Sequence, residues 1–182
     1  HHPGWSHEPE ILVRADALPD AAVWEAHQKS KQDLIGKVRW LSSKQFDPEI
    51  PIFAFARRMT GYKRPELLFS EIDRLLAIHA KHPIQVVMAG KAHPRDGAGQ
   101  ALIERLHAVI RSLDGKLPIV FLPGYDMSLA KILVGGADVW LNTPLPPLAP
   151  ATLFLREFQT WGKAWPSPYK GDGGQEAAAT GM

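Results

Sequence analysis

IFAFARRMTGYKR, residues 52–64, is the stretch that decides the fold. Its first five residues form a short apolar run, which is typical of a fully buried strand. The eight residues after that run include four cations: Arg57, Arg58, Lys63 and Arg64. Open α/β sheets bind ligands just beyond the carboxyl ends of their strands, and Arg and Lys together favour phosphate. The stretch therefore predicts an anion site, with a solvated basic turn as the alternative.

Apolar runs and amphipathic stretches alternate further along the chain. Strands are predicted at 52–56, 84–89, 118–122 and 138–141, and helices at 65–80, 98–113 and 128–134. Near-continuous apolar strands between amphipathic helices indicate a parallel sheet that is covered on both faces. Because βαβ crossovers are right-handed, we expect an α/β fold with a Rossmann-like, doubly wound parallel sheet.

The sequence divides into three parts. Residues 51–148 hold the predicted sheet and are interpreted as a partial Rossmann-like βαβ domain. Residues 1–50 are expected to be a helical lead-in segment, with a helix from about Asp20, its expected N-cap, to Leu41. Residues 149–182 are expected to be a divergent, loop-rich tail with one helix near 152–160. Neither end has a start or stop pattern, so we expect a piece of a longer protein.

The bulk composition excludes several functional classes. A formal net charge of +2 is too small to favour nucleic acid as a partner. The chain has no cysteine, which excludes disulfides and cysteine-ligated metals and fits a cytoplasmic location. No apolar run approaches the roughly 18 residues of a membrane-spanning helix. The histidines are scattered, so we expect no metal site.

Polar side chains follow each predicted strand. Because the carboxyl ends of parallel strands share one sheet edge, we expect these side chains to converge. No dinucleotide-binding or triphosphate-binding glycine motif is present. The prediction is a phosphate-binding cleft faced by Arg57, Arg58, Lys63, Lys91 and Tyr125.

Four segments, correctly ordered and spaced, resemble the α-glucan (glycogen, starch and maltodextrin) phosphorylases. They are FARRMTGYKR (55–64), MAGKAHP (88–94), IVFLPGYDMSLA (119–130) and ADVWLNTP (137–144). The resemblance implies the first half of the C-terminal domain of a GT-B enzyme. Such an enzyme transfers a glucosyl unit from the non-reducing end of an α-1,4-glucan to inorganic phosphate, giving glucose 1-phosphate. It also implies pyridoxal phosphate as cofactor, an N-terminal GT-B domain missing from this chain, and a possible homodimer.

The resemblance also implies roles for individual residues. Two phosphate groups close together require dense positive charge, which explains the basic cluster. The implied phosphate ligands are Arg57, Arg58 and Lys63; the implied cofactor contacts are Arg57, Lys63, Lys91 and Tyr125; the implied substrate contacts are Asn142, Thr143 and Glu176.

The family's Schiff-base lysine is expected to be absent from this chain. In the family it follows the motif Glu-Ala-Ser-Gly-Thr-Ser-Gly-Met, of which residues 176–182 are a shortened echo without the lysine. We therefore expect the chain alone to be inactive.

Two alternatives remain open. The first is a GT-B glycosyltransferase that uses a nucleotide sugar, such as a glycogen synthase, which shares the architecture and a basic diphosphate site. The second is a non-catalytic module that binds glucan or phosphate. The residues at 62–64 and 90–94 favour phosphorylase over the first alternative. Only the missing lysine supports the second, and truncation of a longer protein explains that absence more simply.

Overall fold

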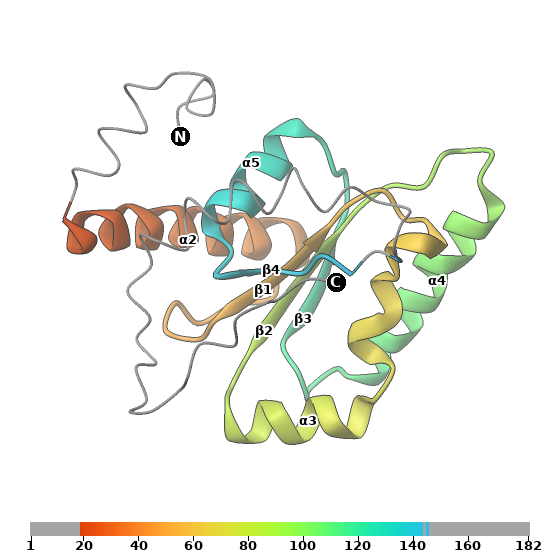
Figure 1. Cartoon of the computed structure of the whole chain (residues 1–182), viewed down its shortest axis with the longest axis horizontal. Helices are drawn as coiled ribbons and strands as arrows, with labels where there is room; N and C mark the ends of the chain where they lie inside the picture. The colour runs from red at the N-terminus through yellow and green to blue at the C-terminus, as the bar shows by residue number, and fades with distance from the viewer. Residues whose placement is uncertain (1–18, 144, 146–182) are drawn as a thin grey trace, which may run out of the picture.

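The computed structural model describes residues 19–143 and 145 (Figure 1). Within them four parallel strands form one sheet, in the order β3-β2-β1-β4. The strands are β1 (Ile52–Ala56), β2 (Gln85–Ala89), β3 (Ile119–Leu122) and β4 (Val139–Trp140). The prediction of an α/β fold with a Rossmann-like parallel sheet is confirmed.

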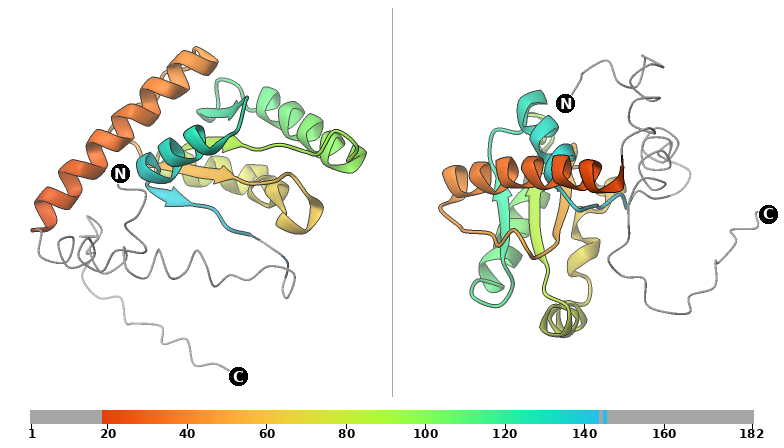
Figure 2. Two further views of the ribbon diagram at one scale, coloured as in Figure 1. Left: turned by 90° about the horizontal axis from the view of Figure 1, so that it is seen from above. Right: turned by 90° about the vertical axis from the view of Figure 1, so that its left-hand side faces the viewer.

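Helices cover both faces of the sheet (Figure 2). On one face, α3 and α4 bury a core that includes Leu75, Leu102 and Leu106 against the strands. On the other face, α2 and α5 bury a second core that includes Leu34 and Leu133. The four helices are α2 (Asp20–Ser42), α3 (Ile72–Lys81), α4 (Gly97–Ser112) and α5 (Met127–Gly136).

The strand order places a topological switch between β1 and β4. The chain moves outward from β1 through β2 to β3, and α5 then returns it to the other side of β1, where β4 pairs. At such a switch the loops at the carboxyl ends of the two neighbouring strands leave toward opposite faces of the sheet, which opens a crevice. The carboxyl end of β1, beside this switch, is therefore the expected position for a ligand.

Two details of the predicted helices are wrong. Asp20 is the first helical residue of α2, and Pro19 holds the N-cap position without a side-chain cap. The expected helix at 65–80 is two elements, a 3-10 helix η2 (Pro65–Phe69) and α3. Phe69 and Leu75 are buried in the same core. Between them Glu71 has a φ of −131° and a ψ of 77°, which is not helical, so the helix is interrupted there.

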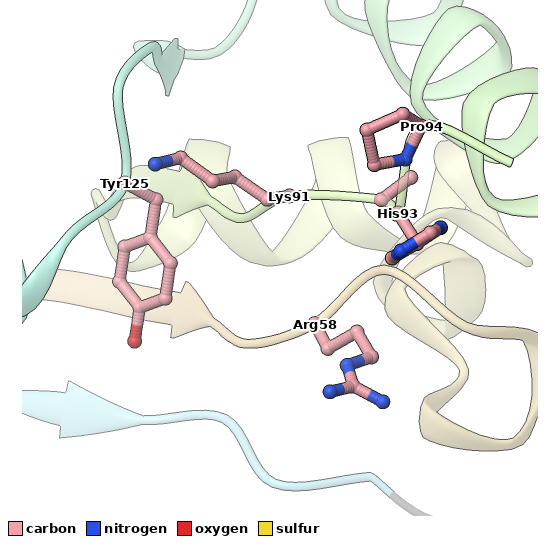
Figure 3. A pocket seen from close by; sticks show the side chains of 6 residues that line it. Arg58, Lys91, His93, Pro94 and Tyr125 are labelled. Atoms are coloured by element: carbon pink, nitrogen blue, oxygen red, sulfur yellow. The ribbon is translucent and has the colours of Figure 1, made fainter. Parts of the chain in front are cut away.

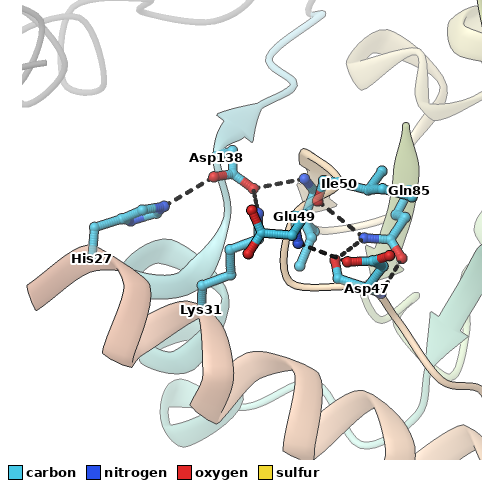
Figure 4. Close-up of polar contacts among 8 residues, drawn as sticks. His27, Lys31, Asp47, Glu49, Ile50, Gln85 and Asp138 are labelled. Atoms are coloured by element: carbon cyan, nitrogen blue, oxygen red, sulfur yellow. Dashed lines mark hydrogen bonds and ion pairs between the residues drawn. The ribbon is translucent and has the colours of Figure 1, made fainter. Parts of the chain in front are cut away.

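A buried ionic cluster joins α2 to the amino-terminal edge of the sheet, the edge opposite the carboxyl ends of β1 and β4 (Figure 4). The Asp138 carboxylate accepts hydrogen bonds from His27 Nε2 (3.0 Å) and from the backbone N–H of Ile52 (2.7 Å). Lys31 Nζ lies 3.0 Å from the same carboxylate. Burial acts to raise the pKa of Asp138, but these hydrogen bonds and the Lys31 charge outweigh it and hold the pKa below its ordinary value.

A buried amide holds the loop that leads into β1. The side chain of Gln85 donates to the carbonyl oxygens of Asp47 (2.8 Å) and Ile50 (3.1 Å), and accepts from the N–H of Asp47 (2.6 Å). Each polar atom of this buried amide therefore has a partner, which offsets its desolvation.

The remaining expectations lie partly outside the described residues. The helix expected near 152–160 and the loop-rich tail fall on residues that the structure does not describe, and the three-part division of the chain stays a prediction. Within the described ranges, no helix is long and apolar enough to cross a membrane.

Candidate anion-binding site

The loops after β1 and β2 run side by side beyond the edge of the sheet. The ladder between the two strands continues through Arg57 N to Ala89 O (3.2 Å) and Met59 N to Lys91 O (3.1 Å). Met59 is fully buried and Arg58, which alternates with it, is exposed. The pleat of the extended chain therefore directs Arg58 away from the core, next to Lys91 on the neighbouring loop.

A cavity of about 470 Å³ lies at this edge (Figure 3). Among the residues that the structure describes, its lining includes a guanidinium, an ammonium and an imidazole, and no carboxylate. Such a set of donors suits an anion, above all one with several acceptor oxygens such as phosphate. The lining residues in the described part of the chain are Arg58, Lys91, Ala92, His93, Pro94 and Tyr125.

Tyr125 closes one side of the cavity. Its hydroxyl donates to the carbonyl oxygen of Ala56 at 3.2 Å, so the ring reaches from the loop after β3 to the end of β1. Burial raises the pKa of Tyr125, and the nearby Arg57 charge opposes that rise only in part. The phenol therefore stays neutral and adds no negative charge to the cavity.

Gly90 sets the distance between the two loops. A Cβ at this position would lie 2.2 Å from the carbonyl oxygen of Arg57 and 2.6 Å from Cε of Met59. The first of these atoms belongs to the backbone and cannot move without breaking the ladder that aligns Arg58 with Lys91.

Gly90→Ala should lower the free energy of unfolding by about 2–3 kcal/mol, because the added methyl overpacks a buried site. Gly97→Ala is the matched control, since a Cβ at Gly97 meets nothing within 4 Å. Urea denaturation of both variants measures the difference. Equal stability of the two would show that the loops tolerate a wider separation.

A second set of contacts fastens the loop after β1 to the segment after β4. Arg57 Nη1 donates to the side-chain oxygen of Asn142, and Arg64 Nε donates to the carbonyl oxygen of Thr143 (2.7 Å). The Thr143 hydroxyl donates to the carbonyl oxygens of Lys63 (2.9 Å) and Arg64 (3.1 Å). Arg64 adopts a left-handed conformation with φ of 47°. These contacts fix both sides of the switch point.

The structure brings some of the predicted site residues together and separates others. Arg58, Lys91 and Tyr125 line the same cavity, whereas Arg57 lies beside it, paired with Asn142. Lys63 is not part of the described lining; its Nζ lies 4.6 Å from the centre of the Tyr62 ring. Glu176 falls outside the described residues. The ligand roles of all of these residues stay predictions.

His93 was not among the predicted ligands, although it lines the cavity. Two features of the sequence pointed to it: its place after the second predicted strand, two residues from Lys91, and its inclusion in the motif at 88–94. Among the described residues no group of three or more His, Asp or Glu side chains could hold a metal ion.

Curated relatives match almost three quarters of the chain. Glycogen phosphorylase from Aquifex aeolicus is 39% identical over 150 residues, which covers 72% of this chain and 22% of the relative. Maltodextrin phosphorylase from Thermococcus litoralis is 35% identical over 147 residues, which covers 73% of this chain and 18% of the relative. The chain belongs to the α-glucan phosphorylase family.

The match to this phosphorylase family is local. The chain spans only 18–22% of the length of these two curated phosphorylases. A glycogen synthase from Nitrosospira multiformis is a more distant relative, 31% identical over 119 residues, covering 62% of this chain and 21% of that protein. No family model matches the chain. The comparisons thus favour a phosphorylase segment over a glycogen synthase segment.

Proposed function

We propose that this chain forms the phosphate-binding part of an enzyme that transfers a glucosyl unit from an α-1,4-glucan to inorganic phosphate, giving glucose 1-phosphate. The observation that carries the proposal is the cavity at the carboxyl edge of the sheet, which is lined by Arg58 and Lys91 and, among the described residues, by no carboxylate. The names of the relatives, glycogen and maltodextrin phosphorylase, support glucan and phosphate as the substrates.

Arg58 and Lys91 are the proposed phosphate ligands. The guanidinium can bind two phosphate oxygens at once, and the ammonium adds a compact charge from the facing loop. Arg57, oriented by Asn142, adds positive charge beside Tyr125 without lining the cavity. Positive charge fixed in advance stabilises phosphate oxygens as negative charge is redistributed during transfer.

Asn142 and Thr143 border the switch point and are proposed to face the sugar. Because the Thr143 hydroxyl shares its one proton between the two carbonyl oxygens, its oxygen is left to accept. It can therefore contact a glucan hydroxyl that donates a hydrogen bond, but not an acceptor. The carbonyl oxygen of Lys63 accepts the hydrogen bond from the Thr143 hydroxyl. The Lys63 side chain is proposed to add positive charge from the loop after β1.

The residues present fit the phosphate end of pyridoxal phosphate, because the cavity offers cations and a neutral aromatic wall. Lys91 would contact such a phosphate, with Tyr125 beside it, and Arg58 would be left for the substrate phosphate. In phosphorylases this cofactor supplies a phosphate that exchanges a proton with the substrate phosphate. The described residues contain no lysine in the sequence context that the family uses for attachment, so we assign no covalent anchor to this chain.

The test is an assay of the complete protein encoded by the reading frame that contains this sequence. With glycogen and inorganic phosphate, it should release glucose 1-phosphate, and omission of phosphate should abolish the product. A parallel reaction with ADP-glucose and glycogen should give no glucan extension. Extension from ADP-glucose without phosphorolysis would establish the glycogen synthase alternative instead. A cytoplasmic location stays part of the proposal.

A further inference from the structure

We propose that His93 is a third phosphate ligand of the cavity, contributing a neutral N–H donor. This inference rests on the proposed function, because it assumes that the cavity binds a phosphate group. Figure 3 shows the His93 ring above the Arg58 side chain, with Lys91 extending toward Tyr125. A ligand between these groups would be reached from both of the loops that follow β1 and β2.

The hydrogen bonding of His93 decides which ring nitrogen carries the proton. The backbone N–H of Arg95 donates to Nδ1 of His93 at 3.1 Å. A backbone N–H can only donate, so Nδ1 must accept with its lone pair, and the neutral ring carries its proton on Nε2. The free nitrogen of His93 is therefore a donor, which matches the acceptor oxygens of a phosphate.

The backbone around His93 is held in place from both sides. Its carbonyl oxygen accepts from the N–H of Asp96 at 2.8 Å, closing a turn at the start of α4. The carbonyl oxygen of the next residue, Pro94, accepts from the side chain of Gln100 at 3.0 Å. Proline also fixes its own φ. A ligand would consequently order little of this loop when it binds.

The charges around His93 favour an anion. Arg58 and Lys91 line the same cavity as His93, and Tyr125 is neutral. The nearest acidic residue in its own loop, Asp96, is directed into the helix, where its carboxylate accepts from the N–H of Gly99 at 2.9 Å. A phosphate group therefore meets a donor at His93 and no opposing carboxylate in the described part of the lining.

The test is a titration of the ¹⁵N-labelled chain, followed by NMR, with inorganic phosphate in one arm and pyridoxine 5′-phosphate in the other. His93→Ala should weaken binding about fivefold, the effect of one hydrogen bond. His93→Gln, whose amide N–H can take the place of Nε2–H, should stay within about twofold of wild type. The control is His82→Ala, since His82 is exposed at the end of α3. The arm in which His93→Ala loses affinity identifies which phosphate this residue contacts.

The same titration separates this inference from the proposed function. Long-range ¹⁵N spectra should show the Nε2–H tautomer of His93, and its resonance should move when the phosphate binds. If Arg58→Ala weakens binding in an arm while His93→Ala weakens it in neither, the role of His93 is wrong and the cavity remains a phosphate site. If Arg58→Ala leaves both arms unchanged, the phosphate-binding proposal itself is wrong.

Discussion

Asp138→Asn should lower the free energy of unfolding by about 3–5 kcal/mol, the cost of removing one partner from a buried ion pair. The amide can still accept a hydrogen bond from the Ile52 N–H, but it cannot neutralise the ammonium of Lys31. The side chain of Lys31 is only 4% exposed, so its charge would remain buried without its carboxylate. Urea denaturation of the chain measures the loss.

Two further variants test that explanation. Asp114→Asn makes the same chemical change in an exposed pair with Lys44 and should leave stability close to wild type. Lys31→Met in the Asp138→Asn background should restore part of the loss, because it removes the unpaired charge. No recovery in the double variant would mean that Asp138 acts through its hydrogen bonds alone.

The Asp138 carboxylate makes the free energy of unfolding depend on pH in the acidic range. Its pKa is depressed in the folded state, so its contribution is complete above the unfolded-state pKa of about 3.9 and is lost as the pH falls through the folded value. Between neutral pH and about pH 4, the free energies of unfolding of wild type and Asp138→Asn should differ by a constant amount. Below about pH 4 the difference should shrink, since wild type loses what Asp138→Asn already lacks.

Arg58→Ala should reduce phosphorolysis by the complete protein about a hundredfold, or about 3 kcal/mol of transition-state stabilisation. The Arg58 side chain lines the cavity, and its loss leaves Lys91 as the remaining permanent cation in the described lining. Initial rates of glucose 1-phosphate formation at saturating glycogen measure the effect.

The matched control is Arg111→Ala, because Arg111 is exposed in the last turn of α4 and does not line the cavity. It removes the same positive charge and should leave the rate close to wild type. Near-normal phosphorolysis by Arg58→Ala would show that the basic stretch is a solvated turn, as the alternative interpretation of the sequence has it.

Much of the fold and part of the site follow from the sequence alone. Four apolar runs, the first of them just before Arg57, predict the four strands. The predicted strands match the observed ones to within about two residues at each end. Parallel pairing then requires the loops that contain Arg58, Lys91 and Tyr125 to meet at one edge, and they line one cavity. The strands could be predicted because the spacing of hydrophobic residues is a local property of the sequence. The meeting of the loops could be predicted because all the carboxyl ends of parallel strands lie at one edge of the sheet.

The tertiary structure decided what local pattern could not. It placed β4 beside β1, so Asn142 meets Arg57 and the Thr143 hydroxyl meets the carbonyl oxygen of Lys63. It also brought Asp138 to Lys31 of α2, more than a hundred residues away. Strand order and side-chain pairing depend on the free energy of contacts between distant segments, which neighbouring residues do not encode. The sequence thus determined which groups reach the edge of the sheet, and only packing decided which of them face the ligand and which hold the loops.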